Sequence, residues 1–535
     1  MDKGINTDFL SRKVKSYQKK TKSKPPKQNN NPAHKTLDNS SFLGSLQQTK
    51  QPLGLLNLMY YEEEEMAKNI MKRPFITSAV LALASTSVQA NFSGIDLNLG
   101  INPAAGGMAG AAYTRPEEST AAIFGNPATL TQFKGYNMNF GASYLMIDAT
   151  NDQRFSGPTG TFENHSVSAA DSYLIPSFGL SVELAEGLVL GLGLETDGGL
   201  GADYRDDPIQ LTAGAAPSLG FPTPVSLPVL IELISFNANI GLGYEVTEKL
   251  SVGVSGTIGF GMFQFGTAGP TSGITAFGAA TGNPGLTDFG GTTASVHDIG
   301  IGASLGATYA LTARTMLSAT IKSEVEYNFE NGVHSTVAPG NGWQDLTIQT
   351  PMEVIVGVST EELFLPGLLA ELDLIWKDLS KASTLQDVWD DQLTAALGAR
   401  YTTGDWVFRL GYKWVEPQQL SANQAGNAIG TLQGVGSLPL GATADMAGFG
   451  AVADDLLGIV QTTLTPVIME HTLSFGVGYN VSETIRIDGY VSHAFKGHEK
   501  RYTPSLNGLA GLPASELEAN TSTTWAGLGI NIALP

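Results

Sequence analysis

Stretches of about ten residues in which apolar and polar side chains alternate recur beyond residue 130, and they restrict the fold more than any other feature. In residues 236–246, apolar side chains occupy the even positions, whereas Asn237, Asn239, Gly241 and Gly243 occupy odd ones. Such alternation places one face of a strand against lipid and the other against a polar lumen. A soluble sandwich shows the same pattern, but its strands usually have about five or six residues. The length of the segments therefore favours a membrane barrel.

About fourteen such segments can be traced, and the links between them alternate between short and long. Outer-membrane barrels have short periplasmic turns and long extracellular loops, and an even number of strands brings both ends of the barrel to the periplasmic side. The predicted strands lie near residues 136–147, 172–184, 187–196, 234–246, 250–262, 298–311, 314–328, 349–359, 368–378, 392–402, 405–415, 470–481, 484–496 and 523–534.

Other features agree with a barrel. Outside the leader, no apolar run reaches the roughly eighteen residues that a transmembrane helix needs. Aromatic residues stand near several segment ends, as an interfacial girdle requires. They are Tyr136, Tyr144, Trp376, Tyr401, Trp406 and Trp414. The sequence thus predicts an all-β fold, a transmembrane antiparallel β-barrel of about 14 strands.

Residues 71–90 have the three parts of a secretory signal peptide. A basic head at 71–73 precedes an apolar run at 75–84, and the small-x-small sequence Val88-Gln89-Ala90 forms a cleavage site. We therefore expect an exported protein whose first residue is Asn91.

Residues 1–70 precede this signal peptide and have the Lys-, Gln-, Asn- and Pro-rich composition of a disordered tail. The interpretation we favour is that the start codon is assigned too far upstream and that Met71 is the initiator. N-terminal sequencing of the exported protein tests this.

Composition limits the partners. The chain has no cysteine, so disulfides and thiolate metal sites are excluded. Its formal net charge of -20 argues against a nucleic-acid partner, because phosphates would be repelled.

Residues 91–135, between the cleavage site and the first strand, are rich in Gly and Ala. They contain Gly107-Met108-Ala109-Gly110-Ala111-Ala112 and, later, Asn126-Pro127-Ala128. An isolated Asn-Pro-Ala is more often a turn than a site. Behind a signal peptide and ahead of a barrel, the two sequences together resemble the N-terminal hatch of FadL-type long-chain fatty-acid transporters, the OmpP1/FadL/TodX family. The resemblance covers most of residues 91–535.

The resemblance implies a hatch at 91–135 that plugs the lumen of a barrel at 136–535, with Asn126, Pro127 and Ala128 as the hatch motif. It also implies a Gram-negative outer-membrane channel that takes up hydrophobic compounds by passive diffusion with lateral release. Long-chain fatty acids are the expected cargo, and aromatic hydrocarbons are the alternative within the family. A general porin or a structural surface protein is the alternative outside it. We expect a monomer in contact with outer-membrane lipid.

The predicted loop 263–298 is too apolar for a segment that faces only water, and such apolar surface is typical of ligand or lipid contact. The alternative is that loop helices pack on one another. The loop residues expected to capture a hydrophobic ligand are Phe263, Phe265, Ile274, Phe277, Leu286 and Phe289. A later loop, 422–467, is similarly apolar and predicts a short helix at 454–460.

Enzymatic interpretations have little support. The histidines are scattered, and His493 and His498 lack the spacing of a metal-binding pair on one helix face. No Gly-x-Ser-x-Gly sequence stands between a strand and a helix. No catalytic residue, metal or cofactor is therefore expected. One feature departs from outer-membrane barrels: the chain ends Ile532-Ala533-Leu534-Pro535, without the usual terminal aromatic residue.

Overall fold

The computed structural model describes residues 97–157, 160–210, 226–267, 295–335, 342–417, 450–466, 469–504 and 515–535. All of them belong to one compact unit, Ala82–Pro535. The predicted leader at 1–70, the signal peptide at 71–90 and the first residues of the predicted hatch lie outside the described residues. No helix in the described ranges is long and apolar enough to cross a membrane.

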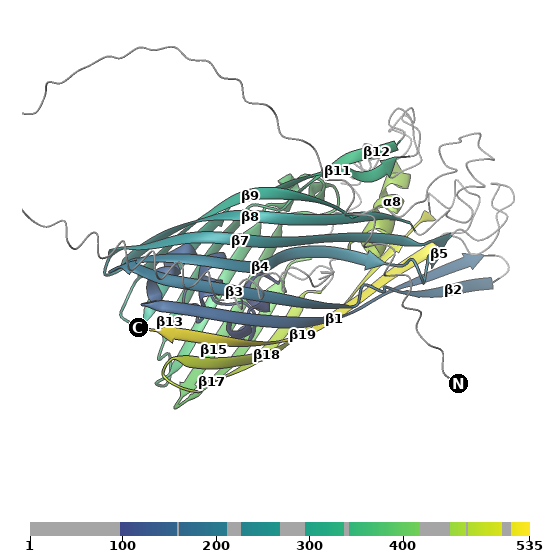
Figure 1. The fold of residues 1–535 in the computed structure, drawn as a ribbon. Coiled ribbons are helices and arrows are strands. Elements are labelled where there is room, and N and C mark those ends of the chain that lie inside the picture. The colour runs from purple at the N-terminus through teal and green to yellow at the C-terminus, as the bar shows by residue number, and fades with distance from the viewer. Residues whose placement is uncertain are drawn as a thin grey trace, which may run out of the picture. The chain divides into compact units, whose positions relative to one another are not determined.

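In the described residues, fifteen strands form one antiparallel sheet, and fourteen of them close into a barrel because the last strand, β19, pairs with the first, β1 (Figure 1). The fifteenth, β2 (Gly160–Val167), pairs with the far end of β1 and with no other described strand. The strands of the ring are β1 (Tyr136–Gly157), β3 (Ser172–Ala185), β4 (Leu188–Asp203), β7 (Val229–Thr247), β8 (Leu250–Thr267), β9 (Val296–Ala310), β10 (Thr315–Lys322), β13 (Glu353–Glu361), β14 (Leu368–Lys377), β15 (Gln392–Thr403), β16 (Trp406–Val415), β17 (His471–Asn480), β18 (Ile485–Tyr502) and β19 (Ser515–Leu534).

The two faces of each strand differ as the alternation predicts. On β16, Trp406, Phe408 and Leu410 are exposed on the outside of the barrel, whereas Val407 and Arg409 between them are buried. Exposed apolar side chains on the outer face are what a lipid-facing wall requires. Fold class and outer-wall pattern were thus predictable from the alternation together with the length of the segments.

Each predicted segment overlaps one strand of the ring, but one of them is wrong in part. The segment 314–328 was expected to be a single wall strand. In the structure the wall strand β10 ends at Lys322. The next strand, β11 (Glu326–Ser335), pairs with β12 (Gly342–Gln349) in a hairpin that is separate from the wall. The hairpin lies on the inner face of β8 and β9, where glycines leave room for it: a Cβ on Gly261 would collide with the ring of Tyr327. Alternation continues into β11, so period two could not distinguish wall from lumen.

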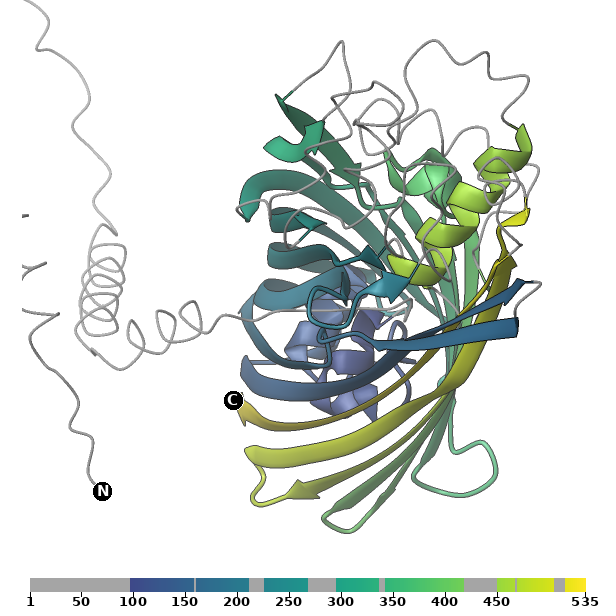
Figure 2. The same cartoon turned by 90° about the vertical axis from the view of Figure 1, so that its right-hand side faces the viewer.

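The described part of the predicted hatch consists of four short helical segments, and they lie inside the barrel near its short-turn end (Figure 2). Their bounds are η2 (Asn98–Ile101), α4 (Pro103–Gly106), α5 (Ser119–Phe124) and η3 (Pro127–Gln132). The predicted helix at 454–460 is confirmed by α8 (Gly450–Thr463). The remaining elements are β5 (Ile209–Gln210), β6 (Ser226–Leu227), η6 (Leu379–Lys381) and η7 (Leu385–Asp387).

Candidate functional site

The hatch motif forms the start of η3 and joins the hatch to the wall. Asn126 is fully buried, and its Oδ1 accepts a hydrogen bond from the amide of Ala128 (3.0 Å), which caps η3. Its Nδ2 donates to the carbonyl oxygens of Tyr113 (3.2 Å) and of Ala307 on β9 (3.3 Å). One amide side chain therefore ties two hatch segments and one wall strand together.

The wall receives this motif on a row of three glycines, Gly243, Gly253 and Gly306, which are register partners on β7, β8 and β9. A Cβ on Gly253 would collide with the peptide between Pro127 and Ala128, and one on Gly306 would collide with the side chain of Asn126. We call these three residues the glycine seat. It lets the hatch backbone approach the wall more closely than any other residue type allows.

An ion cluster holds the hatch on the opposite part of the wall. The Glu117 carboxylate accepts two hydrogen bonds from the guanidinium of Arg409, at 2.7 and 2.8 Å, and lies 3.1 Å from Arg486. Arg409 and Arg486 each contact Asp488 at 2.8 Å. Arg400 lies 3.7 Å from Glu117. Burial alone would raise the pKa of Glu117, but the three arginines outweigh it and hold the pKa well below the ordinary value of 4.5.

The neighbouring residue, Glu118, holds the first hatch helix. Its Oε1 accepts hydrogen bonds from the amides of Ala104 (3.1 Å) and Ala105 (3.0 Å) at the start of α4. Burial raises the pKa of Glu118 to about 7, the hydrogen bond from Ala105 opposes this rise, and the charge of Asp488 adds to it. The pKa values of these two consecutive carboxyl groups are thus shifted in opposite directions, because the carboxylate of Glu117 contacts the arginines and that of Glu118 does not.

A third attachment comes from β14, where two inward-facing carboxyl groups bind hatch backbone. Glu371 accepts hydrogen bonds from the amides of Thr114 (2.6 Å) and Arg115 (3.2 Å). Asp373 accepts one from the amide of Tyr113 (3.3 Å). The hatch is therefore attached on several sides of the barrel wall.

Pairing between β3 and β4 stops partway along the wall. The two strands pair from Ala185–Leu188 up to Phe178–Leu194, and no pairing of the two strands is found beyond this point in the described residues. Beyond this part, the amide of Ala169, in the link that precedes β3, donates to the carbonyl oxygen of Asp203 at the end of β4 (2.8 Å). We call the unpaired part, 172–177 of β3 and 195–202 of β4, the wall window.

Local sequence explains why the window forms. Pro176 on β3 has no amide hydrogen to donate across it. On β4, the pairing with β7 shifts register between Thr196 and Gly198, a bulge that bends the strand. A Cβ on Gly198 would have no neighbour within 4 Å, so the backbone here borders open space.

The inner side of the window touches the hatch. Asn102, fully buried, donates from Nδ2 to the Glu195 carboxylate at 3.2 Å. The hydroxyl groups of Ser177 and Thr196, on opposite sides of the window, are buried without a hydrogen-bond partner in the described residues. Unpaired buried polar atoms are rare in proteins and often mark functional positions.

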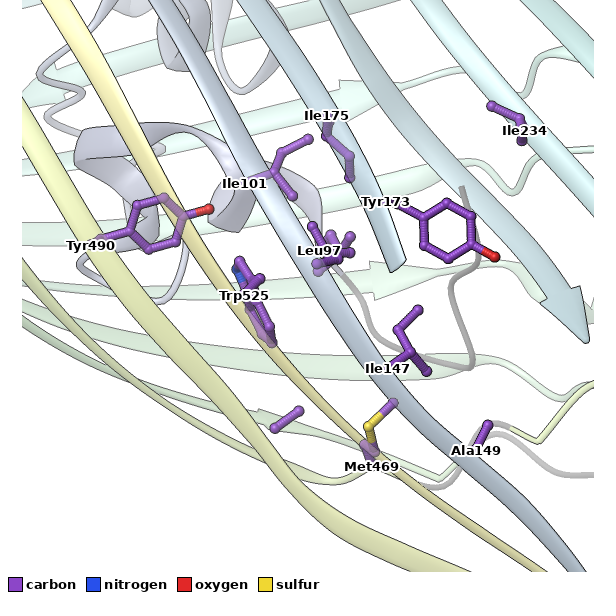
Figure 3. Close-up of a cluster of buried hydrophobic side chains, with 12 residues drawn as sticks. Leu97, Ile101, Ile147, Ala149, Tyr173, Ile175, Ile234, Met469, Tyr490 and Trp525 are labelled. Carbon is purple, nitrogen blue, oxygen red and sulfur yellow. The ribbon is translucent and has the colours of Figure 1, made fainter. Parts of the chain in front are cut away.

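A cluster of buried apolar side chains lies beside the window and the hatch (Figure 3). Leu97 and Ile101 come from the hatch, and Tyr173 and Ile175 come from the β3 side of the window. The other members come mainly from β1, β7, β18 and β19 and are Leu145, Ile147, Ala149, Ile234, Met469, Tyr490, Ala494 and Trp525. The indole of Trp525 donates to the carbonyl oxygen of Gly100 at 3.0 Å, which ties this cluster to η2.

The structure describes two of the six residues expected to capture ligand, and neither of them lies in a loop. Phe263 and Phe265 lie on β8, which continues to Thr267, so their assignment to a loop was wrong. Phe263 is buried in a second apolar cluster with Tyr327 and Phe329 of the β11–β12 hairpin. Ile274, Phe277, Leu286 and Phe289 lie outside the described residues. Sequence reasoning missed the ion cluster and the glycine seat, although charged residues and glycines at inward-facing strand positions were visible signals.

The model of one protein family, described as "Outer membrane protein transport protein (OMPP1/FadL/TodX)", matches residues 81–427. The chain belongs to this family. Membership makes it an outer-membrane protein and a channel for hydrophobic compounds, as the hatch resemblance implied.

Solved structures of the same architecture include the toluene transporter TodX of P. putida, with 18% sequence identity, 80% of this chain and 97% of that chain covered, and a TM-score of 0.53. The toluene transporter TbuX of Ralstonia pickettii has 18% identity over 82% of this chain and 100% of that chain, with a TM-score of 0.53. A FadL homologue of Pseudomonas aeruginosa has 13% identity over 81% and 98%, with a TM-score of 0.55. At these identities the likeness concerns the fold. No curated protein matches the sequence.

Proposed function

We propose that this channel takes up long-chain fatty acids and releases them laterally through the wall window. The observation that carries the proposal is the overlap of the window with the apolar cluster. Tyr173 and Ile175 belong to both, and Leu97 and Ile101 of the hatch face the same cluster. An apolar ligand in this position has the membrane on one side and the hatch on the other.

The periplasmic side of the hatch is less suited to an apolar ligand. A pocket of about 200 Å³ lies there between hatch and wall, and its lining includes Glu117, Glu118, Arg486 and Asn531. Moving an apolar chain past charged groups forfeits the favourable free energy of its burial. Release into the bilayer avoids this region.

Lys413 supports a carboxylate cargo over a hydrocarbon. This buried residue of β16 places its Nζ 3.4 Å from the carbonyl oxygen of Leu97, a member of the apolar cluster. An ammonium group next to an apolar cluster matches an amphipathic anion, whose tail takes the apolar surface and whose head binds the cation.

Closing the window tests the route. The chain has no native cysteine, so Ser177→Cys with Thr196→Cys can be bridged by a short, reducible bifunctional thiol reagent. Uptake of labelled oleate by cells that lack their own transporter should fall on bridging and return on reduction. A matched bridge between Leu397→Cys and Tyr412→Cys, register partners of β15 and β16, should leave uptake unchanged. Full uptake with the window bridged would contradict lateral release.

Cargo is tested separately. We expect Lys413→Met to lower oleate uptake about tenfold, the loss of one charge-assisted hydrogen bond, while uptake of toluene stays the same. Equal losses for both compounds would show that Lys413 has only a structural role. Toluene uptake without any oleate uptake in the native protein would favour the hydrocarbon alternative. Steady ion conductance in planar bilayers would favour a general porin.

A further inference from the structure

The turn between β13 and β14 differs from the other short turns. It spans residues 362–367, and its tip is Leu363-Phe364-Leu365. Phe364 is 84% exposed, the most of any large apolar side chain in the described residues, and Leu363 and Leu365 are each 42% exposed. We call these three residues the apolar tip. Short turns of outer-membrane barrels face the periplasm.

The base of this turn is fixed on both sides. The amide of Glu361 donates to the carbonyl oxygen of Arg314 (3.0 Å), and the amide of Thr402 donates to that of Gly367 (2.9 Å). Arg314 also pairs with Glu362 at 2.6 Å. A well-fastened base holds the apolar tip away from the barrel, where none of its three side chains is buried by the wall.

The other described short turns are polar by comparison. None of them has two large apolar residues in succession, whereas the β13–β14 turn has three. Their central residues are Glu186-Gly187, Glu248-Lys249, Thr312-Ala313-Arg314, Gly404-Asp405 and Ser482-Glu483-Thr484. Water contact therefore explains the composition of those turns but not of this one.

The apolar tip continues the lipid-facing surface. Its two strands expose Val356, Val358, Leu372 and Leu374 on the outer wall. Leu368, directly after the turn, is the register partner of Tyr401. Tyr401 belongs to a set of exposed aromatic residues at the short-turn ends of the strands, the position of an interfacial girdle. The other members are Tyr136, Tyr244, Tyr309, Trp406 and Tyr479.

We propose that the apolar tip inserts into the periplasmic leaflet of the outer membrane, among the phospholipid head groups and upper acyl chains. Aromatic and aliphatic side chains next to a girdle bind this zone because their apolar surface leaves water there. The occupant is lipid, since the tip begins at the girdle and extends an established lipid-facing surface. This inference depends on the barrel and its orientation, and not on the cargo.

The location also has a consequence for the hatch. The strand that follows the turn is β14, whose Glu371 and Asp373 bind hatch backbone, and Glu361 at the base of the turn pairs with Arg115 of the hatch at 3.3 Å. Lipid binding by the tip would hold this strand pair, and the hatch segment attached to it, at a fixed depth relative to the membrane.

A fluorescent reporter tests the proposal in the cysteine-free chain. Phe364→Cys, labelled with an environment-sensitive fluorophore and reconstituted into phospholipid vesicles, should emit to the blue of the aqueous dye. Lipids with a nitroxide near the head group should quench it, and iodide should not. Glu483→Cys, on an exposed polar turn at the same end, is the matched control and should behave in the opposite way. Both positions are exposed, so the barrel should fold in each case, as heat-modifiable gel mobility will verify.

Three results are possible, and each decides the matter. Lipid quenching at residue 364 but not at 483 supports insertion. Iodide quenching at both positions overturns it. If the label at 364 is open to iodide in vesicles, but the thiol of the unlabelled Phe364→Cys variant is protected from a soluble maleimide in native envelopes, a periplasmic protein covers the tip and the lipid proposal is also wrong.

Discussion

The guanidinium of Arg409, on wall strand β16, forms two parallel hydrogen bonds with the carboxylate of Glu117 in the hatch, at 2.7 and 2.8 Å. Neither side chain has appreciable contact with water, with 0% and 7% of their side-chain surfaces exposed. A buried pair of this kind is costly to break from one side, because the remaining charge has lost its partner.

Replacing Arg409 should therefore destabilise the protein strongly. We expect Arg409→Met to lower the free energy of unfolding by about 3 kcal/mol, measured by urea titration in lipid vesicles. The double variant Glu117→Gln with Arg409→Met should lose less than the sum of the two single variants. Strict additivity in this double-mutant cycle would indicate that the pair has no net coupling.

Asn126 should be required for uptake but not for membrane insertion. Asn126→Ala removes the donors to Tyr113 and Ala307 together with the cap on η3, a loss of about 1–3 kcal/mol in hatch attachment. Asn126→Asp keeps the capping acceptor but points a carboxylate at two carbonyl oxygens, so it should be at least as harmful. Oleate uptake measures the defect, and heat-modifiable mobility verifies insertion. Normal uptake by both variants would contradict the role of the motif.

The glycine seat offers a test with a control on the same strand. Gly253→Ala should displace the hatch, because its methyl group would collide with the Pro127–Ala128 peptide. The Cβ added by Gly256→Ala, also on β8, would lie 3.9 Å from the side chain of Ile240, with no closer neighbour in the described residues. We expect this control to leave the position of the hatch unchanged. Single-channel conductance in planar bilayers should rise for Gly253→Ala alone. Equal conductance in the two variants would show that the wall tolerates a Cβ at the seat.

The hatch around Glu118 should become less stable as pH rises from about 4.5 to about 7, because the buried carboxyl group loses its proton. The pKa of Glu118 is raised on folding, so between these values the folded protein binds more protons than the unfolded one, and stability falls with pH. Below pH 4.5 the carboxyl group of Glu118 is protonated in both the folded and the unfolded protein, so a further fall in pH does not change stability through this group. The shift corresponds to about 3 kcal/mol.

Hydrogen exchange of residues 99–118, normalised to intrinsic rates, measures this. Glu118→Gln keeps an acceptor for the amides of Ala104 and Ala105, so its protection should stay constant from pH 4.5 to 8. The same pH response in the native protein and in Glu118→Gln would assign the effect to another group. The depressed pKa of Glu117 acts only at pH values below 4.5, so the two neighbours can be separated.

Sequence periodicity predicted most of the wall but not the lumen. The outward face of β16 is predictable from the alternation, because every residue that faces lipid must be apolar. Arg409 and Gly253 face inward, where each position meets a different part of the hatch. The sequence shows that these residues are charged or small, but it does not show which hatch residue each of them contacts. Their partners, Glu117 and Pro127, lie far away in sequence, and only the closed barrel brings them together.

The window illustrates a different limit. Pro176 is visible in the sequence, but a proline in a predicted strand is compatible with an edge, a bulge or the end of the strand. The pairing of β3 with β1 continues past Pro176, whereas that with β4 does not. A proline lacks the amide hydrogen that would point toward one neighbouring strand. Whether β1 or β4 loses this hydrogen bond depends on the register of the strands, which the sequence does not show.

The seam between β1 and β19 has a consequence for biogenesis. It joins Tyr136–Phe155 to Ser515–Leu534, so the first strand of the ring in sequence order pairs with the last one. Until Leu534 arrives, β1 has an unpaired edge that can associate with other chains. Assembly of this barrel therefore requires that β1 be shielded throughout export, and a chain that lacks only its last strand should aggregate rather than form a smaller barrel.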